Sequence, residues 1–325
     1  MGRLRYVLIR LLQGIGIILA IVALNFFLLR AVPGDPALAM AGEAGAADAE
    51  YLQKMREDWG LDRPILEQLA IYLEGVVTLD FGYSYRFGAP VLDILMERLP
   101  STLLLTTAAF FFALLVGVLL GTIAALKVGS WIDTIVTVVA LAFYAAPIFW
   151  FGLMSILLFA VVLDWVPPVG YQTIGAEYTG FRHFLDVAHH LILPTLTLGL
   201  FYTAIYARLA RASILEVMRM EFITAARAKG LREHRIVIVH ILRNAILPVI
   251  SMAGFQAGHL VGGTVIIETI FAWPGIGRLA FEAVLGRDYP LLLGVFLLTS
   301  AMVVVFNLIT DLIYAQVDPR IEVQS

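Results

Sequence analysis

The segment EFITAARAKGLREHRIVIVHILRNAILP, residues 221–248, is a basic, helix-forming island between long hydrophobic runs. The runs before and after it are each long enough for a helix that crosses a bilayer, which needs about 20 residues. A polar loop held between membrane helices is suited to contact another protein. The segment therefore predicts an all-α integral membrane protein with a contact surface in the cytosol.

The composition of the whole chain agrees with this prediction. Hydrophobic residues make up 61% of the 325 residues and charged residues only 14%, whereas a soluble domain carries about 25% charged residues. The absence of cysteine excludes disulfides, thiolate metal sites and cysteine nucleophiles. The first apolar run, Leu11–Leu29, is longer than a typical signal-peptide core and has no small-residue cleavage site after it, so we expect a retained helix.

Six hydrophobic runs predict six transmembrane helices. They lie near residues 9–29, 101–126, 134–163, 188–207, 248–270 and 290–313. Basic residues gather before the first run and in the 208–247 loop, so the positive-inside rule places both termini and this loop in the cytosol. The expected domains are the cytosolic N-terminus with the first helix (1–29), a periplasmic segment (30–100), and a helical core (101–325) that includes the 208–247 loop.

The 30–100 segment is too polar to enter lipid. Asp62, two residues before Pro64, is a helix-start signal. Ile65, Leu69 and Leu73 then fall on one face, which predicts an amphipathic helix against the membrane or the other spans. A solvated cap without a specific task is the alternative.

The first part of the 221–248 segment predicts a short helix that ends at a glycine. Glu221 lies in the first turn, where the helix dipole favours an acid, and Gly230 stands where a left-handed C-cap favours glycine. We expect Leu231 to fold back onto Ala226 as the apolar contact of such a cap. One face of this helix carries Phe222, Ala225, Ala226 and Lys229. Its small residues would let another protein approach the backbone closely. A loop whose basic residues only touch lipid headgroups is the alternative.

The order of residues in this loop resembles the "EAA" loop of ABC importer permeases. The resemblance rests on Thr224-Ala225-Ala226, three further residues and Gly230, followed by Ile246-Leu247-Pro248; threonine stands at the position of the motif's glutamate. In that family the loop forms a coupling helix seated in a groove of the cytosolic ATPase. The resemblance implies the same role here for Glu221, Thr224, Ala225, Ala226, Arg227, Gly230 and Leu231.

Other segments are similar to the dipeptide/oligopeptide/nickel branch of that family. They are residues 32–36 (VPGDP), 60–64 (GLDRP), 98–103 (RLPSTL), 268–279 (ETIFAWPGIGRL), 287–290 (RDYP), 311–315 (DLIYA) and 318–320 (DPR). The resemblance implies a type I importer permease fold in a bacterial inner membrane, with six transmembrane helices and a helical periplasmic segment. It implies as partners a second homologous permease subunit, two cytosolic ABC ATPases and a periplasmic substrate-binding protein, and no nucleic acid.

The chain has no motif for ATP hydrolysis. A P-loop requires a lysine directly after its last glycine, but Lys54, Lys127 and Lys229 follow glutamine, leucine and alanine. Separate ATPase subunits would therefore bind ATP and Mg²⁺, and we expect no cofactor in this chain. An ion-coupled carrier or channel acting alone is a rival hypothesis, which the scarcity of charge within the spans disfavours.

The fifth predicted span carries candidate residues for transport. Gly254, Gly258 and Gly262 recur at every fourth position, a pattern through which helices pack closely. Gln256 and His259 are polar neighbours in the same run. Close packing within the subunit is one interpretation, and a seam with the second permease beside the translocation path is the other, which the resemblance favours.

The segment after the fifth span predicts a rigid turn outside the membrane, with Trp273, Pro274, Gly275 and Arg278. These residues are candidates for contact with a binding protein or for bracing an outer gate. We expect Glu268 and Asp311 near span ends, within reach of water or loops.

Three histidines precede the fourth span: His183, His189 and His190. We interpret them as residues of the wet membrane edge, and we expect no metal site.

The sequence as a whole predicts a permease subunit of an ATP-driven importer of short peptides. The same machine importing nickel–chelate, glutathione or another small solute stays open.

Overall fold

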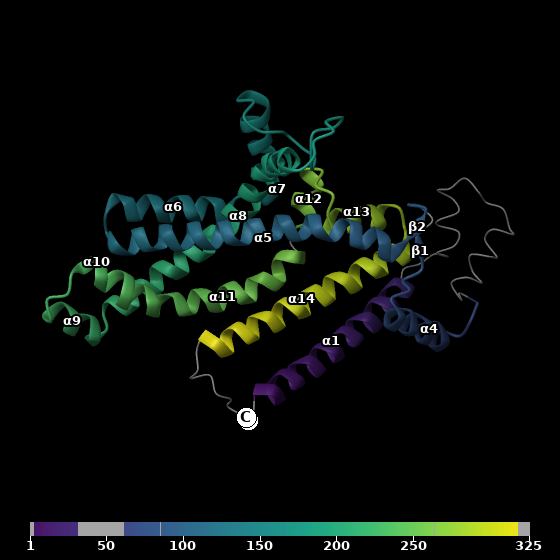
Figure 1. Cartoon of the computed structure of the whole chain (residues 1–325), viewed down its shortest axis with the longest axis horizontal. Helices are drawn as coiled ribbons and strands as arrows, with labels where there is room; N and C mark the ends of the chain where they lie inside the picture. The colour runs from purple at the N-terminus through teal and green to yellow at the C-terminus, as the bar shows by residue number, and fades with distance from the viewer. Residues whose placement is uncertain (1–2, 32–61, 85, 263, 318–325) are drawn as a thin grey trace. The chain divides into compact units, whose positions relative to one another are not determined.

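The computed structural model describes residues 3–31, 62–84, 86–262 and 264–317 (Figure 1). Within these ranges the chain is helical apart from its loops and one short antiparallel hairpin. The chain divides into two compact units, Met1–Thr102 with Pro274–Leu308, and Leu103–Trp273 with Ile309–Ser325. The all-α fold predicted from the hydrophobic runs is confirmed.

The first unit combines the N-terminal helix with helices from the C-terminal part of the chain. Its elements are α1 (Arg3–Ala31), α4 (Ile65–Thr78), β1 (Tyr83–Ser84), β2 (Ala89–Pro90), the beginning of α5 (Val91–Leu126), α13 (Ile276–Leu285) and most of α14 (Tyr289–Val317). Its core is apolar and joins α5, α13 and α14 through Val91, Ile94, Leu95, Ile276, Leu279, Ala283, Leu291, Leu292 and Val295.

The predicted amphipathic helix is present as α4. It begins directly after Pro64, which has the extended backbone expected before a first helical turn. Leu69 and Leu73 are half-buried, while Ile65 is 47% exposed. The ring of Tyr72 stacks on Phe26 of α1 with centroids 5.9 Å apart, so α4 lies against a predicted span.

A polar clasp fixes the hairpin of the first unit. The Ser84 hydroxyl donates to the buried carboxylate of Asp288, and accepts a hydrogen bond from the Phe87 amide at 3.2 Å. The other carboxylate oxygen of Asp288 accepts from the Leu291 amide at 3.2 Å. The hairpin is thereby tied to the turn between α13 and α14.

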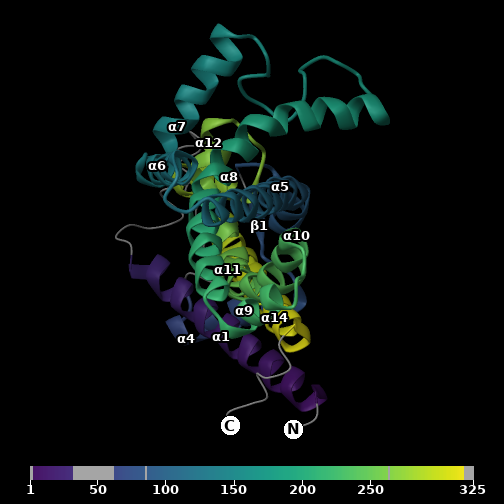
Figure 2. The same cartoon turned by 90° about the vertical axis from the view of Figure 1, so that its left-hand side faces the viewer.

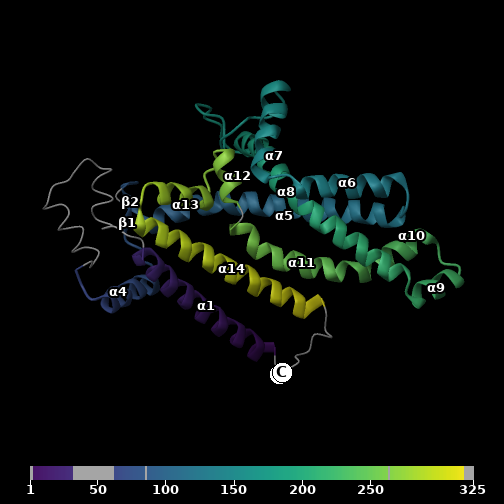
Figure 3. The ribbon, with the colours of Figure 1, turned by 180° about the vertical axis from the view of Figure 1, so that it is seen from behind.

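The second unit contains the end of α5 and the helices that follow it. They are α6 (Trp131–Ala145), α7 (Ile148–Ser155), the π-helical segment η1 (Ile156–Val162), α8 (Phe181–Met218), α9 (Glu221–Ala228), α10 (Glu233–Arg235), the π-helical segment η2 (Ile236–Leu242), α11 (Arg243–Gly262) and α12 (Val265–Ile270). In this unit α6 packs against α8, and α9 lies at the far end of α8 and α11 (Figures 1 and 3). The end of η1 and the first turns of α8 extend from its packed helices (Figure 2).

Close helix packing in this unit depends on small residues. A β carbon at Gly121 of α5 would overlap the carbonyl oxygen of Ala207 in α8, and one at Gly117 would lie 2.6 Å from the Tyr206 side chain. The two helices therefore approach backbone to backbone, as small residues allow in membrane proteins.

Each predicted span contains a helix, and both α5 and α8 extend beyond the predicted 101–126 and 188–207. Helices α5, α8, the continuous run Glu233–Gln256, and α14 over Tyr289–Thr310 are long and apolar enough to cross a membrane, and Leu11–Phe27 is a shorter apolar helix. The third predicted span is bent by 104° between α6 and α7. Ala146 has extended torsions there because the ring of Pro147 disfavours helical torsions in the preceding residue.

The fifth predicted span, 248–270, is displaced. The helix α11 continues from η2, so Pro248 lies inside it rather than at its start, and it ends at Gly262. Membrane helices tolerate such a proline because neighbouring groups satisfy the freed carbonyl. The last residues of the predicted span form the separate helix α12.

Candidate functional site

The short helix predicted for the start of the 221–248 segment is present. Helix α9 spans Glu221–Ala228, and Gly230 follows with a left-handed φ of 73°. The Gly230 amide donates to the Arg227 carbonyl at 2.9 Å, and the Leu231 amide donates to the Ala226 carbonyl at 3.4 Å. These two bonds make a Schellman cap, in which glycine avoids the strain that a β carbon brings at positive φ.

The inner face of α9 rests on an apolar cluster, which we call the α9 seat. Ile223 and Ala226 are buried there, and Leu231 packs against them. The other buried members come from four elements: Ala125 of α5, Ile214 and Val217 of α8, Ile236 and Ile241 of η2, and Ala245 of α11. Since full burial of an isoleucine contributes about 1.5–3 kcal/mol, the seat holds α9 firmly on the helices behind it.

The outward direction of α9 differs from the prediction at one residue. Ala226, predicted on the contact face, is only 7% exposed because it lies one turn from Ile223 and faces the seat. We define the α9 outer face as Glu221, Thr224, Ala225 and Ala228, four of the six exposed residues of α9; the other two are Phe222 and Arg227. Ala228 was missing from the sequence prediction, although its spacing of three from Ala225 places both on one side.

A side-chain clasp joins α9 to α10. Arg227 Nη2 lies 2.7 Å from Glu233 Oε1, and Arg227 Nε donates to Glu233 Oε2 at 3.3 Å. Both side chains are about half exposed, so the pair contributes at most about 1 kcal/mol. Its effect is geometric, because it spans the Gly230 turn and leaves the Arg227 guanidinium engaged within the chain.

A second ion pair, which the sequence analysis did not use, fixes the helix that carries α9. Two guanidinium nitrogens of Arg211 in α8 donate to the two carboxylate oxygens of Asp133 in α6, at 2.7 and 2.9 Å. Asp133 is buried and also accepts from the Gly129 amide at 3.0 Å. Its own amide donates to the Ser130 hydroxyl at 3.4 Å. The Ser-x-x-Asp spacing is a helix-start signal that marks Asp133 in the sequence, but it does not indicate Arg211 as its partner.

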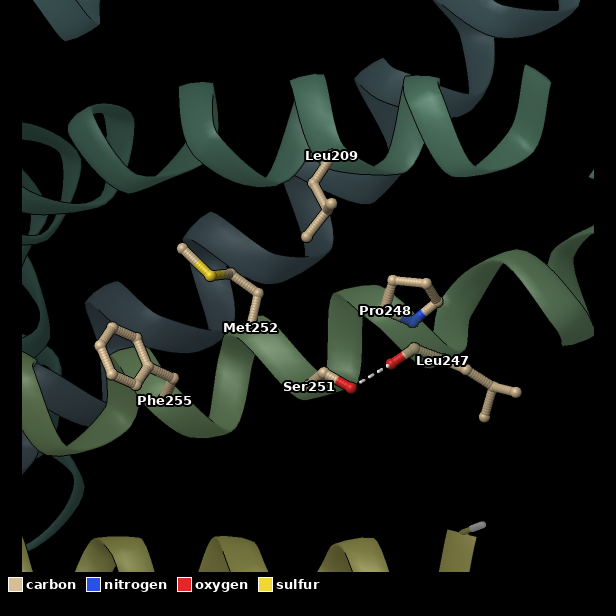
Figure 4. A pocket seen from close by; sticks show the side chains of 6 residues that line it. All are labelled: Leu209, Leu247, Pro248, Ser251, Met252 and Phe255. Carbon is tan, nitrogen blue, oxygen red and sulfur yellow. Dashed lines mark hydrogen bonds between the residues drawn. The ribbon is translucent and has the colours of Figure 1, made fainter. Parts of the chain in front are cut away.

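A groove runs between α8 and α11. One residue of α8, Leu209, points toward α11 (Figure 4), and the hollow measures about 550 Å³. The α11 side of the groove consists of Leu247, Pro248, Ser251, Met252 and Phe255. The Ser251 hydroxyl in this lining donates to the Leu247 carbonyl at 3.0 Å, so it is satisfied within α11. The groove is therefore an apolar surface.

The structure separates the candidate residues of the fifth span. Thr310 of α14 donates to the Gly254 carbonyl at 3.2 Å, and a β carbon at Gly254 would overlap the Thr310 methyl group. Gly254 thus packs within the subunit, and Gln256 is buried. The side chain of His259, and positions Gly258 and Gly262, lie outside the side chains that the structure describes.

The predicted turn around Trp273 is largely buried. Trp273 is fully buried, its ring lies 4.9 Å from the Tyr171 ring, and its amide donates to the Glu268 carbonyl at 2.8 Å. The prediction that Trp273 contacts a binding protein is therefore wrong. Glu268 is also fully buried, contrary to the expected reach to water, because α12 folds back into the unit's core.

The three other candidate residues of this turn lie at the start of α13, two before its first residue and one in its first turn. Gly275 is buried at the N-cap of α13, and Pro274 is half-buried. Arg278 pairs with Glu282 one turn later, with 2.8 Å between the nitrogen and the oxygen.

Two of the three histidines before the fourth span have local partners. His189 Nε2 lies 3.0 Å from the Trp165 carbonyl, and His190 Nδ1 lies 2.9 Å from the Asp186 carbonyl. In the described part of the chain, no three metal-ligating side chains gather.

Comparison with known proteins assigns the family. Residues 117–323 match the family "Binding-protein-dependent transport system inner membrane component", and residues 3–106 match its N-terminal companion, "Binding-prot-dependent transport system membrane comp, N-term". The chain belongs to this family of inner membrane components. It is thus a multi-pass inner-membrane protein, an ABC importer permease.

The inner membrane component has relatives along almost its whole length. It is 39% identical to the dipeptide transport system permease protein DppB of Escherichia coli K12, over 98% of each chain. It is 40% identical to the oligopeptide transport system permease protein AppB of Bacillus subtilis, over 98% of this chain and 99% of the relative. The di/tripeptide transport system permease protein DppB of Pseudomonas aeruginosa is also 40% identical, over 93% of this chain and 94% of the relative.

A solved structure shares the fold of this inner membrane component. The inward-facing MetNI methionine ABC transporter contains a chain that matches with a TM-score of 0.56 and 19% identity, over 70% of this chain and 97% of that one. The likeness confirms the all-α type I importer permease fold.

Proposed function

We propose that this inner membrane component is the permease subunit of an ATP-driven importer of short peptides. The observation that carries the proposal is the 39–40% identity, over nearly the full length, to permeases named for dipeptide and oligopeptide transport. The apolar groove between α8 and α11 and the seated helix α9 support it, because an importer subunit needs both a surface for a partner permease and a point of coupling.

In the proposed mechanism, the energy comes from outside the chain. Two cytosolic ATPase subunits bind ATP with Mg²⁺ and contact the α9 outer face, while both termini lie in the cytosol. A push on α9 reaches α5, α8 and α11 through the α9 seat, because side chains of all three helices pack into it. Dense apolar packing transmits such displacement because it has little free volume.

The proposed path follows α8. A second, homologous permease subunit covers the open side of the groove, and a periplasmic substrate-binding protein delivers the peptide to the outer end. The Asp133–Arg211 pair keeps α6 fixed to α8 while the helices move.

The test is uptake of radiolabelled dialanine into proteoliposomes. We expect ATP-dependent uptake by the complete importer, with stronger competition from unlabelled dialanine than from a nickel chelate or glutathione. Vesicles that contain this subunit alone, with a proton or sodium gradient, should take up none. Uptake by the isolated subunit would contradict the proposal and favour an ion-coupled carrier.

A further inference from the structure

Arg208 is a charged residue of α8 that the coupling account does not use. Its side chain is exposed, and its guanidinium carbon lies 5.0 Å from the centre of the Tyr144 ring. The Tyr144 ring stacks in turn on Phe201, with centroids 5.5 Å apart and an angle of 17° between the rings. Phe201, Tyr144 and Arg208 thus form one continuous stack, which we call the Arg208 stack.

The Arg208 stack lies deep along α6. Helices α6 and α8 are paired at one end by Asp133 and Arg211, and further along by Tyr144 and Phe201. Tyr144 follows Asp133 by 11 residues, which is about 16 Å of helix and about half of a 30 Å hydrocarbon core. Arg208 therefore reaches away from the end of α8 that carries α9. A lipid-facing arginine would reach the other way, toward the nearer surface.

The charge of Arg208 is not neutralised among the residues that the structure describes. Arg211, one turn away, is bound by both oxygens of Asp133, whereas Arg208 lies against the face of the Tyr144 ring. An aromatic ring covers one face of a guanidinium and leaves the N–H groups at its edge available. At membrane depth a charged side chain faces a water-filled cavity or an anion, because lipid disfavours it strongly.

We propose that Arg208, oriented by Tyr144, receives the carboxylate of the transported peptide. This inference rests on the proposed function. The guanidinium fork matches a carboxylate in two parallel hydrogen bonds, and a linear peptide of any sequence carries a terminal carboxylate. A single exposed contact of this kind selects the substrate class without holding it, because water competes for both partners.

The first experiment measures ATP-dependent dialanine uptake by the complete importer in proteoliposomes. Arg208→Gln should lower uptake about tenfold, since it removes a charge-assisted pair, and Arg208→Lys should retain part of it. Arg182→Gln, an exposed arginine elsewhere on α8, serves as the matched control and should leave uptake unchanged. Wild-type uptake by Arg208→Gln would overturn this inference alone. A wild-type importer that moves no peptide would overturn the proposed function, and this inference with it.

The second experiment uses the lack of cysteine in the chain. Arg208→Cys gives this subunit a single thiol, to which water-soluble methanethiosulfonates add either an ethylammonium or an ethylsulfonate group. The cationic adduct should restore dialanine uptake, the anionic one should not, and dialanine should slow both reactions. An unreactive thiol, together with loss of co-purified anionic lipid in Arg208→Gln, would assign Arg208 to a lipid headgroup and overturn the inference.

Discussion

The amide of Leu231 donates to the carbonyl of Ala226 across Gly230, so the chain reverses directly behind α9. The same turn places the Leu231 side chain against the α9 seat. A single backbone cap therefore determines both where α9 ends and how it is anchored. If α9 couples ATP hydrolysis to transport, this cap is part of the coupling.

Substitution of Gly230 should uncouple the importer in a graded way. Gly230→Ala has free space for its β carbon but meets strain of about 1–2 kcal/mol at φ 73°. Gly230→Pro also loses the amide that donates to Arg227, so its effect should be larger. The measurement is the number of ATP molecules hydrolysed per dialanine imported, which should rise from wild type to alanine to proline. An unchanged ratio in the proline variant, with normal membrane insertion, would count against the role of α9.

Removal of the Ile223 side chain should loosen α9 from its seat. Ile223→Ala leaves a cavity in a fully buried cluster, which costs about 2–5 kcal/mol. Ile238→Ala is the matched control, because Ile238 is 63% exposed in η2. We expect a clear fall in the Tm of the purified subunit for the first variant only. Equal Tm values for the two variants would mean that Ile223 does not anchor the helix.

The Asp133–Arg211 pair should show energetic coupling. Asp133→Asn and Arg211→Gln should each destabilise by about 1–3 kcal/mol, because each leaves a partly buried partner unpaired. The double variant should lose less than the sum of the two single losses. Denaturant unfolding of the four proteins gives the coupling energy, and strict additivity would refute a direct interaction.

The stability of the first unit should depend on pH through Asp288. Burial raises the pKa of this carboxyl above its ordinary value, although the Ser84 hydroxyl and the Leu291 amide oppose the shift. The folded state therefore holds the proton more tightly than the unfolded state does. This contribution is fully present below the ordinary aspartate value, about 4, and is lost as the pH rises through the raised pKa.

The variant Asp288→Asn isolates that contribution, because asparagine cannot titrate. The Tm of the wild type relative to that of the variant should fall as the pH rises from about 4. A difference that is constant with pH, or that moves in the opposite direction, would contradict the raised pKa.

The sequence was most informative where structure is set locally. The α9 cap needs only Gly230 and its neighbours, and α4 needs only Pro64 and a periodic apolar face, so both were predicted. The bend before Pro147 was also a local signal, but it was hidden inside a long hydrophobic run.

Other features depend on residues far apart in the chain. The direction in which Ala226 points is set by the α9 seat, whose members come from α5, α8, η2 and α11. The groove requires the relative placement of Leu209 and α11, and the burial of Trp273 requires Tyr171. Periodicity in one segment does not encode such long-range packing.

The most direct test of the central claim is a cross-link from the α9 outer face to the ATPase. Ala225→Cys is exposed on that face, and Ile174→Cys, at a position 100% exposed in the loop before α8, is the control. In a transporting complex we predict a disulfide or bifunctional adduct between Ala225→Cys and the ATPase subunit, and none from Ile174→Cys. Active transport without an adduct at Ala225→Cys, or with one at Ile174→Cys, would contradict the account.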